Sequence, residues 1–253
     1  MILVLAGTKD GRQLAAKLAQ AGYEVIVSVI SQHGCQLAAQ DNMVIHTDKL
    51  DQTEMVNFIR NHNIKLVIDT SHPYAVNVSK NAINACHSLN VDYLRYERPA
   101  TSLSSYKNLH TVQNYQEAAC KAADLGKVVF LTTGSRMLET FKAEPKLQEH
   151  RIIARVLPDP DVIAKCVALG FSLSDIVALQ GPFSHQLNSI MFKDYGAEVI
   201  VMKNSGQIGG SDTKLSAAAE LNLPVIIINR PTVSYRNIVS NYDDILTYVK
   251  EVF

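Results

Sequence analysis

Short apolar segments alternate with segments of helical periodicity along the chain. In the first half the apolar segments are MILVLAG, EVIVSVI, MVIH, KLVIDTSHPY and VDYLRYERP, at residues 1–7, 24–30, 43–46, 65–74 and 91–99. The stretch DGRQLAAKLAQAG after the first of them places Leu14, Leu18 and Ala21 on one helical face. Continuous β-branched runs are typical of strands covered on both faces, and their alternation with helices predicts βαβ units in a parallel sheet.

The same alternation restarts in the second half. Its apolar segments are VVFLTTG, HRIIARVL, DIVALQGP, AEVIVMK and PVIIINRP, at residues 128–134, 150–157, 175–182, 197–203 and 224–231, and a last helix is expected at residues 243–252. Roughly eight to ten strands at this spacing favour two doubly wound lobes over a single sheet or a single barrel. We therefore predict an α/β protein with two Rossmann-like lobes and parallel sheets, residues 1–104 and 105–253, joined within the polar segment 100–110.

Composition narrows the range of partners. The 24 basic and 24 acidic residues cancel, and no basic stripe is present, so nucleic acid and anionic membranes are not expected as partners. The four cysteines are far apart and form no C-x-x-C pair, which predicts buried thiols in place of disulfides or zinc. Without a signal peptide pattern or an apolar run of membrane-spanning length, we expect a soluble, reduced, cytoplasmic protein, as a monomer or homodimer.

Unusual polar segments follow the predicted strands. They are GTKDGR, DTSHPYA, RYERP, TTGSR, QGPFS, KNSGQIGGSDTK and NRP, at residues 7–12, 69–75, 95–99, 132–136, 180–184, 203–214 and 229–231. Parallel sheets bind their ligands beyond the carboxyl ends of the strands. We therefore expect an active site in the cleft between the lobes, with ligand-binding groups on both walls.

Two of these segments in the first half have a structural and a functional interpretation. Gly7 and Gly11 allow a tight turn, and they also allow backbone N–H groups at a helix start to attract an anion, reinforced by Arg12. In DTSHPYA a serine cap and a proline at the helix start explain part of the pattern. They do not explain the grouping of an acid, a histidine and a tyrosine, which favours an active-site role.

The segment KNSGQIGGSDTK combines three glycines, three hydroxyl side chains and a lysine at each end. Glycines permit positive φ and close backbone approach, so the combination predicts an anion-binding loop; the alternative is a plain flexible turn. The glycines match neither the G-x-G-x-x-G nor the phosphate-binding G-x-x-x-x-G-K-[ST] pattern. The second apolar run ends at Ser31 without an acidic residue, so a nicotinamide cofactor would need a nonstandard site or one that tolerates a 2′-phosphate. H-E-x-x-H and G-x-S-x-G motifs are absent, and no metal site is expected.

Taken together, these segments resemble the precorrin-6A reductase family of cobalamin biosynthesis, including the cobalt-precorrin-6A reductases. The matching elements are GTKDGRQLA, DTSHPYAVNVSKNAINAC, YLRYERP, VFLTTG, QGPFS, VMKNSGQIGGSDTKLSAA and VIIINRP, in the family's order and over nearly the whole chain. Thr70-Ser71 stands where the family often has Ala-Thr. The resemblance implies that NADPH or NADH reduces one double bond of a tetrapyrrole, with hydride added at C19 and a proton at C18.

The resemblance also allows roles to be assigned as hypotheses. His72 and Tyr74 are candidates for proton delivery, although both residues could instead only bind substrate or shape the turn. The expected cofactor-binding residues are Thr132, Thr133, Gly134, Lys203, Ser205, Gly206, Gly209, Gly210, Lys214 and Arg230. The expected substrate-binding residues are Gly7, Thr8, Arg12, Asp69, Ser71, His72, Tyr74 and Arg98. Arg230 could meet a 2′-phosphate or a substrate carboxylate, and the glycine-rich loop is expected to hold the pyrophosphate.

Two other functions fit parts of the pattern. A nucleotide-sugar oxidoreductase or epimerase would need a Y-x-x-x-K pair, but Val78 stands four positions after Tyr74. A non-catalytic protein that binds a dinucleotide or a tetrapyrrole would show affinity without turnover.

Overall fold

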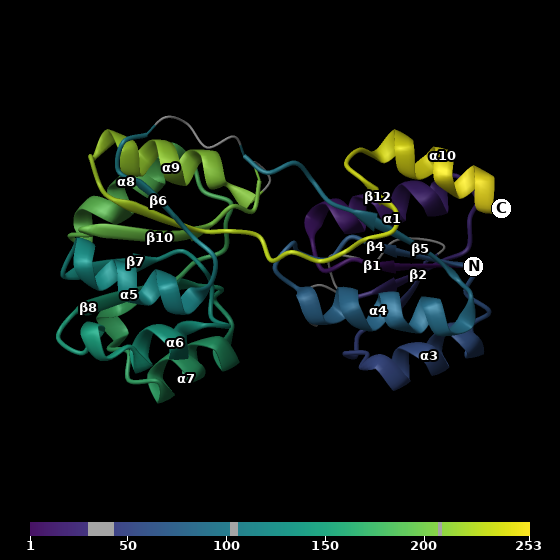
Figure 1. Ribbon diagram of the computed structural model, residues 1–253, viewed down its shortest axis with the longest axis horizontal. Helices are drawn as coiled ribbons and strands as arrows, with labels where there is room; N and C mark the ends of the chain where they lie inside the picture. The colour runs from purple at the N-terminus through teal and green to yellow at the C-terminus, as the bar shows by residue number, and fades with distance from the viewer. Residues whose placement is uncertain (30–42, 102–105, 207–208) are drawn as a thin grey trace. The chain divides into compact units, whose positions relative to one another are not determined.

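The computed structural model describes residues 1–29, 43–101, 106–206 and 209–253. They form two compact units (Figure 1): unit 1 consists of Met1–Pro99 and Thr232–Phe253, and unit 2 consists of Ala100–Pro231. Each unit contains one six-stranded open sheet in which all neighbouring strands are parallel. The predicted α/β class with two parallel Rossmann-like sheets is confirmed, and the single-barrel alternative is wrong.

Unit 1 has the strand order of a Rossmann fold. Its strands are β1 (Ile2–Leu5), β2 (Val25–Ser28), β3 (Met43–His46), β4 (Leu66–Asp69), β5 (Asp92–Tyr96) and β12 (Ile238–Val239), arranged β12-β5-β4-β1-β2-β3. Helices α1 (Lys9–Gln20) and α10 (Tyr242–Val252) cover one face of the sheet, and α3 (Gln52–Asn61) and α4 (Val76–Leu89) cover the other (Figure 1). The strand order reverses between β1 and β4, where ligands bind in folds of this type.

The core of unit 1 joins the beginning and the end of the chain. Leu14 and Leu18 of α1 lie in one buried cluster with Ile245 and Val249 of α10, and all four are fully buried. The two helices cover the same face of the sheet, so the C-terminal helix completes the N-terminal core.

Unit 2 repeats this arrangement with one exchange. Its strands are β6 (Leu109–Val112), β7 (Val128–Leu131), β8 (Arg151–Val156), β9 (Ile176–Ala178), β10 (Val199–Lys203) and β11 (Val225–Ile228), arranged β6-β11-β10-β7-β8-β9. The covering helices are α5 (Tyr115–Leu125), α6 (Leu138–Ala143) and α7 (Pro160–Ala168) on one face, and α8 (His185–Asp194) and α9 (Ser211–Glu220) on the other (Figure 1). The first strand of this unit, β6, takes the edge position that the last strand of the chain, β12, takes in unit 1.

The expected lobe boundaries need one correction. We expected the second lobe to be residues 105–253, but Thr232–Phe253 belongs to unit 1. The physical reason is that β12 pairs with β5, with Ile238 opposite Arg95, and α10 fills the unit 1 core. The edge strands β6 and β12 were not predicted, whereas each predicted strand segment contains an observed strand.

Cys86 and Cys166 are buried and Cys120 is half-buried, and these three thiols are free, in agreement with the sequence; Cys35 and Ser31 lie outside the described residues. No helix in the described ranges has the length and apolar character that a membrane span requires.

Candidate functional site

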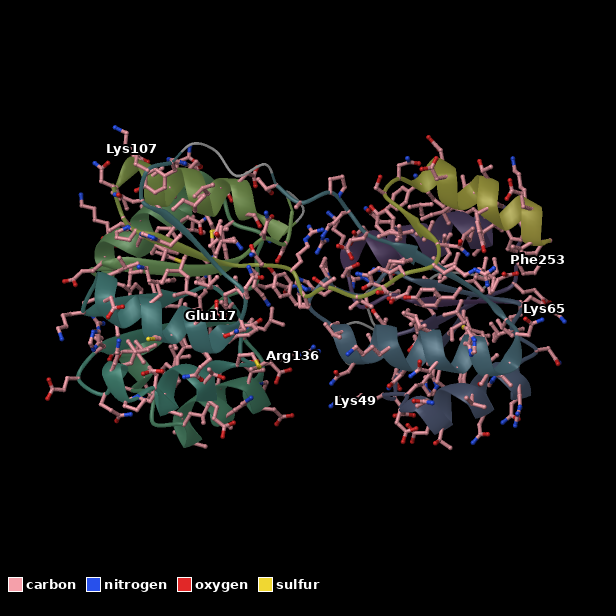
Figure 2. The ribbon with its side chains drawn as sticks, viewed as in Figure 1. Lys49, Lys65, Lys107, Glu117, Arg136 and Phe253 are labelled. Atoms are coloured by element: carbon pink, nitrogen blue, oxygen red, sulfur yellow. The ribbon has the colours of Figure 1, made fainter. Side chains whose placement is uncertain are left out.

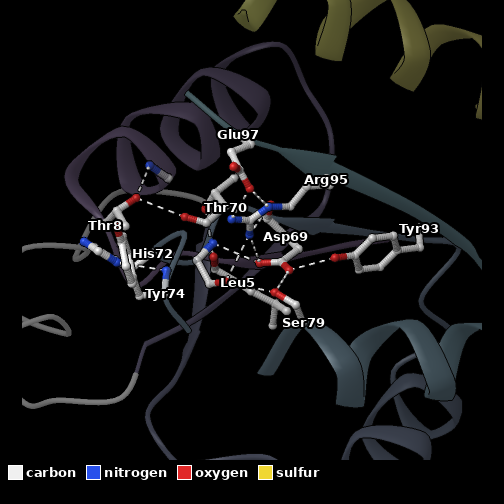
Figure 3. A network of polar contacts seen from close by, with 12 residues as sticks. Leu5, Thr8, Asp69, Thr70, His72, Tyr74, Ser79, Tyr93, Arg95 and Glu97 are labelled. Atoms are coloured by element: carbon white, nitrogen blue, oxygen red, sulfur yellow. Dashed lines mark hydrogen bonds and ion pairs between the residues drawn. The ribbon is translucent and has the colours of Figure 1, made fainter. Parts of the chain in front are cut away.

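The loops that follow β1 and β4 lie side by side in unit 1. Leu5 and Asp69, the last residues of these parallel strands, are opposite each other, so the chain leaves both strands at the same edge of the sheet. Thr8 Oγ1 accepts a hydrogen bond from Gly11 N at 3.2 Å and donates one to the Thr70 carbonyl at 3.0 Å. Thr70 Oγ1 in turn donates to the Leu5 carbonyl at 2.7 Å (Figure 3). These bonds fix the two predicted substrate loops against each other at the point where the strand order reverses.

Asp69 lies at the centre of a buried polar network below this loop (Figure 3). Its Oδ1 accepts from Ser71 N at 2.9 Å and pairs with Arg95 Nη1 at 2.9 Å. Its Oδ2 accepts from Ser79 Oγ at 2.6 Å and from the Tyr93 hydroxyl at 2.7 Å. We expected Asp69 to bind substrate, but its side chain is 0% exposed, so a substrate group cannot reach it in this structure. Asp69 instead stabilises the loop after β4 from its buried side.

His72 and Tyr74 lie together at the exposed side of the same loop. The Tyr74 N–H donates to His72 Nδ1 at 3.2 Å, and the two ring centroids are 5.6 Å apart. Because Nδ1 is the acceptor, the neutral imidazole carries its proton on Nε2. Both side chains are half-buried. The geometry brings the two candidate proton donors together, and their catalytic role stays a prediction.

The two predicted arginines of unit 1 differ in their surroundings. Arg12 is half-buried in the first turns of α1, where burial lowers the pKa of its guanidinium and Asp10 opposes that shift. Arg98 is buried, and its Nη1 contacts the two carboxylate oxygens of Asp10 at 3.1 and 3.3 Å. Asp10 therefore already balances the charge of Arg98, whereas Arg12 has the more open position.

Unit 2 contains an equivalent pair of loops, after β7 and after β10. Val201 of β10 pairs with Leu131 of β7, and Thr132 Oγ1 donates to the Val201 carbonyl at 3.0 Å. Three glycines of these loops adopt positive φ, a conformation that side chains rarely tolerate. The values are 80° at Gly134, 78° at Gly206 and 65° at Gly210.

The glycine-rich loop is folded by its own hydrogen bonds. Ser211 Oγ, in the first turn of α9, accepts from Ser205 N at 2.9 Å and donates to the Lys203 carbonyl at 3.2 Å. A Cβ at Gly209 would lie 2.4 Å from Ser205 Cβ, so only glycine fits there. These contacts link the two ends of the loop to each other.

Positive charge gathers beside this loop. Lys214 is only 8% exposed, and its pKa is lowered to about 7, first by burial and then by repulsion from Arg155 and Lys203, with Asp212 opposing. Lys203 is half-buried, and its pKa is lowered to about 8, first by burial and then by the exposed Arg136 (Figure 2). Neither a hydrogen bond nor an ion pair links Lys214 Nζ to another described residue.

Arg155 of β8 lies close enough to Lys214 to lower the pKa of that lysine, and the sequence reasoning did not select Arg155 as a candidate site residue. It is 7% exposed, and burial lowers its pKa to about 10. Its Nη1 donates to Asn188 Oδ1 at 2.8 Å, and its guanidinium lies 4.6 Å from the ring centroid of Phe183 in the QGPFS loop. No carboxylate pairs with it among the residues described. A charged residue inside the apolar segment RIIARV is the signal that could have revealed it. We call Arg155, Lys203 and Lys214 the cationic cluster.

Arg230 joins this site from the end of β11. Its Nε donates to the Asn204 carbonyl at 2.9 Å, and the Asn204 side chain exchanges two 3.0 Å hydrogen bonds with the backbone of Thr101. The predicted cofactor-binding residues of unit 2 therefore converge on the loops after β7, β10 and β11.

The cationic cluster has the chemistry to bind a ligand with several negative charges. Buried cations normally have acidic partners, whereas Lys214 and Arg155 form no ion pair with a described carboxylate, and a buried polar group without a partner costs about 1–3 kcal/mol. Thr133 Oγ1 is also buried and has no hydrogen-bond partner within the described part of the chain. The pyrophosphate of a nicotinamide dinucleotide supplies both the charge and the acceptors, so these residues fit that group. Carboxylates of a polyacidic ligand have the same chemistry.

Dinucleotide-dependent enzymes are commonly built from Rossmann-type units that bind anionic groups where the strand order reverses. This chain contains two units of that type. Residues 1–250 match the protein family described as precorrin-6x reductase CbiJ/CobK. The chain belongs to this family, and it is therefore an oxidoreductase of cobalamin biosynthesis that works with a nicotinamide cofactor.

Known relatives of this family can be aligned with this chain over nearly its full length. The chain is 39% identical to the cobalt-precorrin-6A reductase of Priestia megaterium over 248 residues, which cover 97% of this chain and 96% of the relative. It is 30% identical to the precorrin-6A reductase of Rhodococcus erythropolis over 232 residues, 91% of this chain and 89% of the relative. A solved structure of CobK precorrin-6A reductase superimposes with a TM-score of 0.84 at 26% identity and covers 99% of this chain and 96% of that one. The nucleotide-sugar and non-catalytic alternatives receive no support from these matches.

Proposed function

We propose that this protein reduces precorrin-6A or cobalt-precorrin-6A to the dihydro product at the C18=C19 double bond. The observation that carries the proposal is that each unit places a pair of loops with polar donor groups where the strand order reverses. The macrocycle carries several carboxylate side arms, and both loop systems present hydroxyl, backbone N–H or cationic donors suited to such groups.

We assign the cofactor to unit 2. Lys203, Lys214 and the backbone of Ser205, Gly206, Gly209 and Gly210 would hold the pyrophosphate, and Thr132, Thr133 and Gly134 would hold ribose or phosphate groups. Arg230 would meet a 2′-phosphate, which favours NADPH over NADH. The bound nicotinamide supplies the hydride. The protein would fix the direction in which the nicotinamide approaches the macrocycle, and it would balance the negative charge of the cofactor phosphates.

We assign the macrocycle to the loops of unit 1. Gly7, Thr8 and the half-buried Arg12 would meet one group of carboxylates, and Ser71, His72 and Tyr74 would line the loop after β4. Since the Tyr74 N–H donates to His72 Nδ1, the neutral imidazole would present its Nε2–H to the macrocycle as a hydrogen-bond donor; transfer of a proton from His72 would require the imidazolium form, in which Nδ1 no longer accepts from Tyr74. A proton from water at C18 is the alternative route, since a protonated conjugated ring accepts hydride without a strong protein acid.

Purified protein should be mixed with NADPH or NADH and with precorrin-6A, either metal-free or carrying cobalt. The expected result is oxidation of the cofactor together with a change in the macrocycle spectrum in at least one pairing. Absence of turnover in all four pairings would overturn the proposal.

A separate experiment with Lys214→Met tests the assignment of the cofactor to unit 2 and of the macrocycle to unit 1. If the cationic cluster binds the cofactor, Kd for NADPH without substrate rises about 10- to 100-fold, as expected when one charged hydrogen bond is lost. If only KM for the macrocycle rises, the cluster binds substrate carboxylates and the two assignments must be exchanged.

A further inference from the structure

Arg95 is a fully buried cation on β5 for which the proposed reaction has no direct use. Its Nη1 contacts Asp69 Oδ1 at 2.9 Å, the Asp69 carbonyl at 3.4 Å and Ser71 Oγ at 3.1 Å. Its Nε and Nη2 donate to Glu97 Oε2 at 3.3 and 3.2 Å (Figure 3). One guanidinium therefore links β5 to the end of β4 and to the first residues of the loop that follows it.

These contacts converge on Ser71, the residue immediately before His72. The backbone N–H of Ser71 is held by Asp69 Oδ1 at 2.9 Å, and its hydroxyl is held by Arg95 and lies 3.4 Å from Ser79 Oγ. Ser71 is 7% exposed, so most of its surface faces this network. The backbone N–H and the hydroxyl of Ser71 are thus held by the buried network of Asp69 and Arg95. These bonds also fix the direction in which the chain enters His72.

The charges around Arg95 keep the guanidinium ionised. Burial alone would lower its pKa, but the nearby carboxylates of Asp69 and Glu97 outweigh burial and raise it. The Tyr235 ring, from the returning C-terminal segment, has its centroid 5.2 Å from the Arg95 guanidinium carbon. Lysine cannot reproduce this set of contacts, because an ammonium is a single point donor and the guanidinium is a planar fork.

We propose that Arg95 is a positioning residue for the reaction, acting through Ser71 to fix the loop that carries His72 and Tyr74. The proposal rests on the assignment of this loop to the macrocycle. A purely structural ion pair would instead affect stability and leave the rate constant of the folded enzyme unchanged.

The test is a double-mutant cycle of Arg95→Lys and Ser71→Ala, with kcat, KM for macrocycle and cofactor, and Tm measured for each protein. Arg95→Lys is expected to lower kcat about 30- to 100-fold, the scale of a displacement of about 1 Å at a reacting group. KM for the cofactor should remain within about twofold. Because both changes act on one contact, Arg95→Lys should cost less than about threefold in the Ser71→Ala background. Additive losses in kcat would overturn the proposal.

A second readout does not depend on turnover. Amide hydrogen exchange in residues 70–75 should accelerate in Arg95→Lys, while exchange in β1 and β2 stays as in the wild type. Arg151→Lys is the matched control, because Arg151 forms an ion pair with Asp175 at 2.8 Å in unit 2, away from the proposed site residues. Its kcat and its loop exchange should equal those of the wild type. Unchanged exchange in residues 70–75 of folded Arg95→Lys would overturn the proposal.

If Arg95→Lys does not fold, Glu97→Gln replaces it. Glu97 holds the outer end of the guanidinium, and its side chain is 19% exposed, so the change is tolerated more easily. We expect kcat to fall about two- to fivefold with little change in Tm, as for a partly exposed ion pair. Wild-type kcat in this variant would contradict the proposal. Turnover by the wild type in the same preparation separates a failure of the proposed function from a failure of the role of Arg95.

Discussion

Replacing Lys214 with methionine should stabilise the free protein and impair its binding of the cofactor. The substitution removes a buried charge and retains a flexible apolar chain of similar length. Lys214 is 8% exposed, and its pKa is lowered from 10.5 to about 7, mainly by burial. The native state therefore stabilises the charged form far less than the unfolded state does, and this penalty disappears when the charge is removed.

The size of the gain follows from the pKa shift. A shift of about 3.5 units at 1.36 kcal/mol each gives about 5 kcal/mol as an upper limit for the penalty at low pH. Water penetration and relaxation reduce such penalties, and we take about 2 kcal/mol as the expected gain in the free energy of unfolding. At about 2–4 °C per kcal/mol, Tm should rise by about 4–8 °C.

The sign of the pH dependence distinguishes this explanation from a packing effect. Between pH 7 and 10.5 the unfolded wild type binds more protons at Lys214 than the native protein, so wild-type stability rises with pH across this window. The advantage of Lys214→Met should be largest below pH 7 and should shrink toward pH 10.5. Packing alone would give a difference that does not depend on pH.

The assay is thermal unfolding of the wild type, Lys214→Met and Lys107→Met at several pH values, with and without NADPH. Lys107 is exposed and serves as a control for the same chemical change (Figure 2). NADPH should raise the Tm of the wild type and of Lys107→Met, and should have little effect on Lys214→Met. A Lys214→Met protein that is less stable than wild type at low pH, or that shows the full Tm increase with NADPH, would refute the reasoning.

Three further predictions concern other parts of the structure. Deleting residues 232–253 should unfold unit 1 and leave unit 2 protected in limited proteolysis, because α10 and β12 complete only the unit 1 sheet and core; equal digestion of both units would contradict this. Gly11→Ala would place a Cβ 2.0 Å from Thr70 Oγ1 and should lower the free energy of unfolding by about 1–3 kcal/mol in urea denaturation. Gly7→Ala meets nothing within 4 Å and should change stability by less than about 1 kcal/mol; equal losses in both variants would refute the steric argument. Thr133→Val should leave Tm unchanged or raised, because the buried hydroxyl has no described partner, and should weaken cofactor binding in titration; unchanged affinity would remove Thr133 from the site.

The sequence predicted the strands that carry strong apolar runs and missed two of the four edge strands, β6 and β12. β12 has only two residues and lies in the polar stretch NIVSN, and β6 contains a histidine and a threonine. These two edge strands lack a continuous apolar run, so periodicity does not reveal them, whereas the edge strands β3 and β9 carry such runs and were predicted. The assignment of the last 22 residues to unit 1 depends on long-range pairing, which no local pattern encodes.

For the site, the sequence identified the segments but not the orientation of every side chain. The loops that contain Ser71, His72 and Gly206 lie where predicted, at the carboxyl ends of parallel strands. Asp69 was expected to face a ligand, and it is buried because it is still part of β4 and its side chain points into the unit. Arg155 gave only the indirect signal of a charge within an apolar strand, and the role proposed for it rests on the absence of a carboxylate partner among the described residues.

The exchange of edge strands has a consequence for synthesis on the ribosome. After Pro99 has been made, residues 100–231, which are 132 residues, must be added before the segment that completes unit 1 begins. At about 5–20 residues per second this takes roughly 7 to 26 seconds. During this time β5 has an open edge and the face of α1 lacks its cover from α10. The half of the protein that is translated first is therefore the last to close, and chaperones have their longest access to that half.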